Sequence, residues 1–482
     1  MPSTDRAPSG GRPELSGGRA GEAKPRRVET TPLATAVCID VGSTFTKALH
    51  VDLTTGEVLG SASHPTTLPG RDGWTDVMEG YDACLAALAE QDERAATAEV
   101  LGCSSAGGGL RIAVVGNEEL VTAEAGRRVA LSSGGTVVDV VAAAEGARLD
   151  PAAAPDLVLL TGGTDGGNSE VLLRAARELV SDGWRGPVVV AGNTAAREEI
   201  DVILAGVPHV HADNVMPRIG VLAPDGARAA IREAFLAHVI GGKQLSGRPE
   251  FTGMVRGATP DVVLTGAEVL ARAVAEQAPD RRTGVVVVDI GGATTDVHSV
   301  VEPDPESAGR EVVATTPVTR TVEGDLGMRW SAVTTVEAAG LADLAEAARR
   351  RQETPGYLPD SDAEREIDEA IARAAALTAL QRHAGRARVV VSPEGKVVER
   401  TGTDLREATL LVGSGGVLRH GGRGVAERVL GGLDTRDGWQ LPERAAVVVD
   451  RDYVLAAVGL LAGVRPEAAY RLARRLAVGT EG

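Results

Sequence analysis

The sequence is poor in aromatic residues, cysteine and long apolar runs, and each shortage excludes a class of protein. Phe, Tyr and Trp together make up 2% of the 482 residues, too few for the aromatic platforms on which nucleic-acid bases stack. Three Cys cannot form a disulfide framework, which favours a reducing, intracellular compartment. No run of 18 apolar residues occurs, so we expect no transmembrane helix and no membrane partner.

Basic charge is also scarce. Lys and Arg number 50 against 67 Asp and Glu, so the formal net charge is −17 and the chain lacks the basic surface of a nucleic-acid-binding protein. Only four of the 50 basic residues are Lys. A Lys retained in so Arg-rich a chain is a candidate for a position where a compact ammonium is required. We therefore expect a cytoplasmic protein that does not bind nucleic acid.

What the sequence contains is enough apolar material, at 43%, for large cores, and a length that suggests two to four domains. Residues 1–32 are rich in Pro, Gly, Ser and Arg and predict a disordered tail. From residue 33 onward strands and helices alternate, which indicates an α/β fold. We expect a first domain over 33–260, with inserted βα units at about 150–250, and a second domain over 261–482.

Two strand-ending segments resemble each other at an offset of 249 residues: VCIDVGSTFTK over 37–47 and VVVDIGGATTD over 286–296. Each is a buried strand, an Asp, a turn of Gly and hydroxyl residues, and a second strand. Turn N–H groups and hydroxyls donate to phosphate oxygens, and a strand-end Asp can hold hydrated Mg²⁺. The segments therefore predict two phosphate-binding turns. The candidate phosphate ligands are Gly42, Ser43, Thr44, Thr46, Lys47, Gly291, Gly292, Thr294 and Thr295; the candidate Mg²⁺ and catalytic carboxylates are Asp40 and Asp289, with Asp296 as candidate general base.

This pair resembles the phosphate segments of the actin, sugar kinase and heat-shock chaperone ATPase superfamily. The resemblance implies two duplicated, ribonuclease H-like α/β domains with Mg-ATP in the cleft between them. Within it, Lys47 matches the Lys that contacts the phosphates. A strand followed by Gly413, Ser414, Gly415 and Gly416 resembles the adenosine motif of the same superfamily. Small-residue helices over 262–275 and 453–463 are placed where the two connector helices belong.

Further stretches resemble the glutamate mutase accessory proteins, the MutL-type proteins of the methylaspartate pathway. Together they extend over nearly the whole chain after residue 33. The resemblance implies an accessory or reactivating ATPase, with chaperone-like action on the subunits of an adenosylcobalamin-dependent carbon-skeleton mutase. The stretches are 40–48, 103–115, 160–168, 289–298, 323–330 and 452–461.

The residues alone leave other interpretations open. A small-molecule kinase or a non-hydrolysing, actin-like scaffold would carry the same nucleotide segments, and ATP could be hydrolysed or only sensed. Residues 161–168 form either an anion cradle before a helix or a turn that shapes the insertion. His209 and His211 alternate in a strand-like stretch before Asp213, and we interpret them as surface residues rather than metal ligands. Val301 replaces the Gly of the cobalamin-binding D-x-H-x-x-G motif that begins at Asp296, so cobalamin is not expected through that motif.

Overall fold

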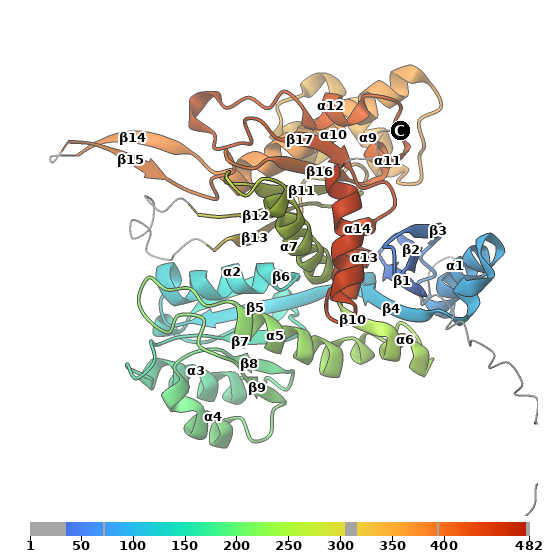
Figure 1. Cartoon of the computed structure of the whole chain (residues 1–482). Coiled ribbons are helices and arrows are strands. Elements are labelled where there is room, and N and C mark those ends of the chain that lie inside the picture. The colour runs from blue at the N-terminus through green and yellow to red at the C-terminus, as the bar shows by residue number, and fades with distance from the viewer. Residues whose placement is uncertain (1–34, 71–72, 304–315, 393–394, 479–482) are drawn as a thin grey trace, which may run out of the picture. The chain divides into compact units, whose positions relative to one another are not determined.

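The computed structural model describes residues 35–70, 73–303, 316–392 and 395–478. The tail predicted over residues 1–32 lies outside these described ranges. The described chain is an α/β fold with three five-stranded sheets and one separate hairpin (Figure 1). None of its described helices combines the length and apolar character that crossing a bilayer requires.

Two of the three sheets repeat one strand order. In each, the first strand pairs antiparallel with the second, the second antiparallel with the third, and a fourth and a fifth strand add parallel on the other side. This duplication confirms the predicted fold class of two actin-like α/β halves. The first sheet contains β1 (Thr35–Val41), β2 (Phe45–Asp52), β3 (Val58–Pro65), β4 (Glu99–Ser104) and β10 (Val255–Ala258), and the second β11 (Gly284–Ile290), β12 (Thr295–Val301), β13 (Val318–Glu323), β16 (Leu410–Ser414) and β17 (Ala446–Val449).

The third sheet is inserted between β4 and β10 and is wholly parallel, in the order β6-β5-β7-β8-β9. Its first strand begins at Leu110, earlier than the expected insertion at about 150, because short apolar runs do not show which sheet a strand joins. Helices cover both faces, as parallel strands require (Figure 1). The elements are β5 (Leu110–Gly116), β6 (Gly135–Ala142), β7 (Leu157–Leu160), β8 (Val188–Val190) and β9 (His209–His211), with α2 (Glu124–Ser132) and α5 (Asp225–Ala234) on one face and α3 (Glu170–Ser181) and α4 (Arg197–Ile203) on the other.

Three helices pack between the inner faces of the two repeated sheets: α7 (Thr259–Gln277), α13 (Val454–Ala462) and α14 (Pro466–Val478). Residues of β1, β2, β4, β11 and β16 share one apolar core with them. Figure 1 shows α7 and α13 side by side. The outer faces are covered by α1 (Met78–Gln91) and α10 (Asp362–Ala384). The remaining α-helices of the described residues and the separate hairpin are α6 (Pro249–Met254), α8 (Ala332–Ala338), α9 (Ala345–Glu353), α11 (Gly416–His420), α12 (Val425–Leu430), β14 (Ala387–Ser392) and β15 (Gly395–Arg400).

Strand alternation decides which way the two strand-end carboxylates point. Cys38 in β1 and Val287 in β11 both lie in the inner core around α7 and α13. Successive side chains of a strand point to opposite faces, so Asp40 and Asp289, each two residues further on, point to the same inner side. The fold therefore brings the two carboxylates together from strands 249 residues apart.

Candidate functional site

The two predicted turns have the same backbone geometry. The N–H of Gly42 donates to the carbonyl of Phe45 at 3.1 Å, and the N–H of Gly291 donates to that of Thr294 at 2.8 Å. A Cβ on either glycine would lie 2.8 Å from that same carbonyl oxygen, closer than real Cβ atoms come. Both turns therefore require Gly at this position. Residues that correspond at the sequence offset of 249 also make the same backbone contact in the structure.

Asp40 lies at the carboxyl end of β1, opposite Lys47 on β2. Its Oδ2 is 3.7 Å from the Lys47 Nζ, and its Oδ1 accepts a 2.6 Å hydrogen bond from the hydroxyl of Thr259 at the start of α7. The Cys103 thiol, at the end of β4, lies 3.7 Å from the same oxygen. Asp40 is thus held from three elements, and its side chain is almost fully buried.

Lys47 lies between the two halves of the fold. Its Nζ is 3.7 Å from the centre of the Tyr453 ring, at the start of α13. Burial lowers the pKa of Lys47, but attraction to Asp40 and to the Tyr453 phenol outweighs burial. Asp289 adds to that attraction, so the pKa lies above its ordinary value and Lys47 is charged at neutral pH.

The pKa of Asp289 is also raised, which for a carboxyl group disfavours the charged form. Burial raises the pKa of Asp289, and Lys47 and a hydrogen bond from Ser414 oppose this rise without cancelling it. The carboxylates of Asp296 and Asp40 raise the pKa further, because like charges disfavour a second ionised group. Asp40 and Asp289 therefore share the one ammonium of Lys47, which leaves Asp289 only partly compensated.

Asp296 faces Asp289 across the β11–β12 hairpin and is held by a buried arginine. Arg320 on β13 donates to the Asp296 Oδ1 through Nη2 at 2.5 Å and through Nε at 3.1 Å. The other carboxylate oxygen, Oδ2, accepts a 3.3 Å hydrogen bond from the Thr294 hydroxyl. Asp296 therefore orients a hydroxyl of the second turn, and its role as a general base stays a prediction.

The segment predicted to bind adenosine lies directly beside the second turn. β16 pairs parallel with β11, and Ser414 stands opposite Asp289. Gly415 follows with a φ of +111°, and a Cβ there would lie 2.3 Å from the carbonyl oxygen of Ile290. Gly413 lies in the buried strand β16, and Gly416 begins α11. The Gly-rich turn is thus required by close backbone approach to the phosphate hairpin.

The candidate phosphate ligands of the two turns differ in solvent exposure. Ser43 and Thr44 are exposed, whereas Gly292 and Thr294 are half-buried. Thr46 and Thr295 are fully buried, and the Thr46 hydroxyl lies 3.3 Å from the hydroxyl of Thr66. These last two threonines follow the strand alternation to the outer face of each sheet, so the structure does not place their side chains with Asp40 and Asp289.

Residues 323–330, for which the sequence indicated no role, pack against the second turn. The N–H of Met328 donates to the carbonyl of Gly291 at 3.0 Å, and that of Arg329 to Gly292 at 2.8 Å. The Ser331 hydroxyl donates to the carbonyl of Ala293 at 2.6 Å. Trp330 stands beside this turn with 55% of its surface exposed. The family-like sequence of this stretch was the only signal that could have marked it.

Residues 161–168 follow β7 in the inserted sheet and are braced by two buried asparagines. The Asn193 side-chain amide donates to the carbonyl of Gly167 at 2.9 Å, and that of Asn214 to the carbonyl of Gly163 at 2.9 Å. Gly162 has a φ of +138°, and a Cβ there would overlap the side-chain oxygen of Asn117. The loop is therefore shaped by its own insertion; its role in ligand binding stays open.

The two expected connector helices cross at glycines. A Cβ on Gly266 of α7 would lie 2.1 Å from the carbonyl oxygen of Leu455, and one on Gly459 of α13 would lie 1.9 Å from that of Val262. The helix backbones therefore touch directly. Glu268 of α7 pairs with Arg228 of α5 at 2.7 Å.

A duplicated actin-like fold with two phosphate-type turns defines the class of protein, and comparison with known proteins gives the family. The chain matches the model of the MutL protein family over residues 36–476. It is 34% identical over 470 residues to Protein MutL of Clostridium tetanomorphum, covering 91% of this chain and 98% of that relative. The chain therefore belongs to the MutL protein family, as the sequence stretches predicted.

Solved structures show only distant likeness. A nucleotide-free acetone carboxylase matches with a TM-score of 0.32 and 16% identity, over 61% of this chain and 48% of its own. Plasmodium falciparum glycerol kinase with ADP matches at 0.32 and 10%, over 92% and 93%. EutJ of Carboxydothermus hydrogenoformans matches at 0.27 and 12%, over 92% and 91%. The fold assignment rests on the strand order of the sheets themselves.

Proposed function

We propose that this protein binds Mg-ATP between its two phosphate-type turns and couples ATP hydrolysis to remodelling of an adenosylcobalamin-dependent mutase of the glutamate type. The observation that carries the nucleotide site is the duplicated hairpin. Its two strand-end carboxylates, Asp40 and Asp289, point to one inner side and share one ammonium, Lys47. We place the protein in the cytoplasm, where such a mutase would be met.

The residues present fit Mg²⁺. This ion prefers carboxylate oxygens and keeps much of its water, so it needs one or two carboxylates rather than a closed protein cage. Asp289 has a raised pKa mainly because it is buried and also because Asp296 and Asp40 repel its charge, and a nearby divalent cation would favour its ionised form. Asp40 and Asp289 are therefore the residues that would hold Mg²⁺, which neutralises phosphate charge when bound.

The phosphates of ATP have donors on both turns. The exposed hydroxyls of Ser43 and Thr44 and the half-buried hydroxyl of Thr294 accompany the turn N–H groups. Lys47 adds the local positive charge that the acidic chain otherwise lacks, which stabilises the transferring phosphoryl group. The turn from Gly413 to Gly416 would contact the adenosine, since it lies beside the second phosphate turn.

Coupling to a partner requires that the partner bind the ATP and ADP states with different affinity. The tight crossing of α7 and α13 is suited to this task, because connector helices in backbone contact transmit a small rotation between the two sheets. The mutase itself is proposed from family membership and from the stretches that resemble the accessory proteins.

The nucleotide site is tested by ATP turnover and by binding measured separately through the fluorescence of exposed Trp330. Asp40→Asn and Asp289→Asn should each lower turnover at least about a hundredfold, as loss of a metal-holding or charge-stabilising group does. Asp434→Asn, which alters an exposed surface pair with Arg436, is the matched control and should turn over normally. Equal turnover in all four proteins would reject the site.

The partner is tested independently of turnover. Tagged full-length chain is mixed with purified glutamate mutase subunits in the presence of ATP or of ADP, and the captured subunits are quantified. The proposal expects capture that differs between the two nucleotides. Equal capture with both nucleotides, or none with either, would reject mutase remodelling while leaving the ATP site standing.

A further inference from the structure

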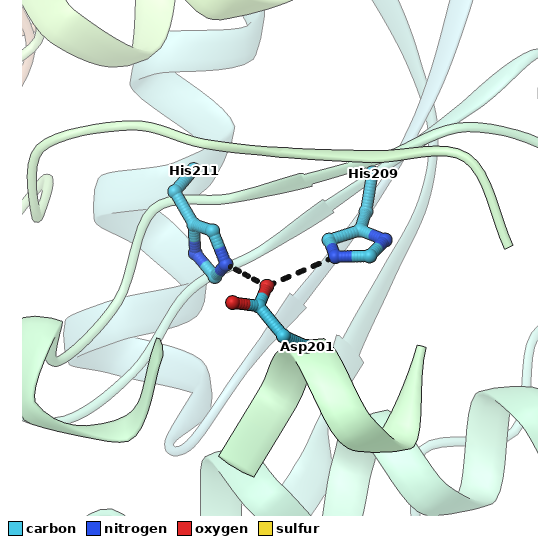
Figure 2. A group of neighbouring side chains, drawn as sticks. All are labelled: Asp201, His209 and His211. Carbon is cyan, nitrogen blue, oxygen red and sulfur yellow. Dashed lines mark hydrogen bonds and ion pairs between the residues drawn. The ribbon is translucent and has the colours of Figure 1, made fainter. Parts of the chain in front are cut away.

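Two histidines and one aspartate converge at the edge of the inserted sheet. His209 and His211 are the first and last residues of β9, the edge strand, and alternate residues of a strand point to the same face. Asp201 comes from α4, which covers that face. Figure 2 shows both rings directed at the Asp201 carboxylate.

The two rings meet one and the same oxygen. The Nε2 of His211 lies 2.6 Å from the Asp201 Oδ1, and the Nε2 of His209 lies 3.0 Å from that oxygen (Figure 2). Nitrogen and carboxylate oxygen of all three side chains lie within 4.8 Å of one another. Two imidazoles and one carboxylate are the donors that zinc and related divalent ions prefer.

The protonation of His209 shows why a cation suits this arrangement. The His209 Nδ1 lies 2.8 Å from the carbonyl oxygen of Val207, and a carbonyl can only accept, so Nδ1 carries the proton. In neutral His209 the Nε2 then presents a lone pair to the Asp201 oxygen, which also presents one. Two lone pairs that face each other repel, and a cation between the two atoms would turn this contact into an attractive one.

The same hydrogen bond to a backbone carbonyl is what orients a metal-binding imidazole. A histidine that donates through one ring nitrogen to a carbonyl is fixed in the tautomer whose other nitrogen can bind metal. The Asp201 carboxylate supplies the oxygen of the donor set, and its Oδ1 is the atom that both Nε2 atoms approach. Among the described residues, no hydrogen-bond partner meets the buried Nδ1 of His211, so nothing fixes its tautomer against metal binding.

We propose that Asp201, His209 and His211 form a site for a divalent transition-metal ion of the Zn²⁺ class, separate from the nucleotide site. Ligand atoms around tetrahedral Zn²⁺ at about 2.0–2.1 Å lie about 3.3 Å apart, so a slight opening of the present contacts admits the ion. Asp201 is 55% exposed, which gives the ion access and leaves a fourth position to water. The ion would tie α4 to the edge strand of the inserted sheet.

The sequence analysis considered these histidines together with Asp213, whereas the structure places Asp201 beside them. Asp213 is the acid nearest to them in the sequence, but its side chain is 85% exposed and lies 3.9 Å from Arg197. Asp201 is eight residues before His209, on the preceding helix, and only the packing of α4 brings it to β9. That geometry supplies the third ligand that alternation of two histidines could not show.

The test uses the full-length chain, stripped with EDTA and titrated with Zn²⁺, with bound metal measured by mass spectrometry after dialysis. We expect one Zn²⁺ per chain, and Co²⁺ in its place should give visible d–d absorption. Asp201→Asn and His211→Ala should each weaken Zn²⁺ binding more than about a hundredfold, beyond the loss usual for an outer-shell partner. Asp213→Asn and His64→Ala, a matched acid and a matched histidine, should bind as the unchanged chain does.

A second measurement separates loss of the site from loss of the fold. Zn²⁺ should raise the melting temperature of the unchanged chain and of the two control variants, because the ion binds only the folded form. It should not raise that of folded Asp201→Asn. Absence of bound Zn²⁺, or equal binding in a His209→Ala, His211→Ala double variant, would overturn the proposal whatever the outcome of the ATP measurements.

Discussion

The ammonium group of Lys47 contacts charged and aromatic groups from several elements at the centre of this fold. It is one of four lysines in the chain, it lies 3.7 Å from Asp40 and 3.7 Å from the centre of the Tyr453 ring, and Asp289 is close enough to perturb it. A compact ammonium fits between two acids and a ring, whereas a planar guanidinium needs more width and directs its donors in a fixed fork.

Replacement of this lysine is therefore expected to cost activity although the charge is kept. Lys47→Arg should lower ATP turnover at least about tenfold, because the guanidinium cannot take the place of the ammonium between Asp40 and Tyr453. Lys243→Arg is the matched control, since Lys243 pairs with Asp156 in the inserted unit at 2.8 Å. Steady-state turnover of both variants checks the prediction. Equal turnover in the two variants would mean that position 47 does not require lysine rather than arginine.

At this scale the sequence predicted the residues that belong to local motifs and missed those that arrive from elsewhere. Asp40, Lys47 and Asp289 stand in short segments whose spacing carries the chemistry. Thr259 reaches the same site from 219 positions after Asp40, and Tyr453 from the start of α13. The sequence placed Tyr453 at the start of a connector helix but did not indicate its contact with Lys47. Their contribution depends on packing, which only the folded chain shows.

The crossing of α7 and α13 is the element on which any relative motion of the two sheets depends. The Cβ of alanine at position 266 would lie 2.1 Å from the Leu455 carbonyl oxygen, so the helices would have to separate. Gly266→Ala should lower the free energy of unfolding by about 2 kcal/mol, within the range of overpacked cores.

Gly253→Ala is the matched control for this change. Gly253 lies in α6, and a Cβ there would meet no atom within 4 Å. Its replacement should be neutral or should stabilise by up to about 1 kcal/mol, as removal of a helical glycine does. Urea denaturation of both variants makes the comparison, and an equal effect on the two proteins would contradict a close helix crossing.

A buried histidine near the end of α10 gives this part of the fold a pH dependence. His383 lies between the hydroxyls of Ser299 and Thr321, at 2.8 and 3.0 Å, and burial lowers its pKa to about 4. Between that value and the ordinary 6.5, the unfolded chain binds a proton that the folded chain does not. The free energy of unfolding should therefore fall by about 3 kcal/mol as the pH falls from 6.5 through 4.

Because burial also lowers the pKa of His298, the test is a difference between two proteins. His383→Gln should lose part of the acid sensitivity between pH 6.5 and 4.5, by the uptake of about one proton. Urea denaturation across this pH range measures it. An identical pH slope in the variant would show that His383 does not titrate as its surroundings indicate.

The elements themselves were largely predictable, and the exceptions have physical reasons. The strand–turn–strand pattern of both hairpins was read from the two related sequence segments. β5 was read as a strand but not as the start of the inserted sheet, because its apolar run fits either sheet. The charged helix α10 buries Asp368, which pairs with the fully buried Arg351 at 2.5 Å, and this partner is set by tertiary packing that no local pattern shows.

Across the whole molecule, one buried arginine joins the second turn to the inserted sheet. Arg320 is 3% exposed; it holds Asp296 and also donates to the carbonyl of Gly135 at 3.1 Å and, more weakly, to that of Leu131 at 3.4 Å. Gly135 begins β6 and Leu131 lies in the last turn of α2. A change in the position of Asp296 is therefore passed to the inserted unit through a single guanidinium.

This link predicts that nucleotide is sensed in the inserted sheet through Arg320. ATP should change amide hydrogen exchange over α2 and β6 in the unchanged chain. Arg320→Lys, which keeps the charge but cannot reach Asp296 and both carbonyls together, should lose that change at least in large part. Arg228→Lys weakens one of two ion pairs between α5 of the insertion and α7, namely Arg228–Glu268 beside Arg232–Asp261, and should keep the change, because Arg228 does not touch the turn. An ATP response that survives Arg320→Lys undiminished would mean that the insertion senses nucleotide by another route, with the α7 contact as the next to test.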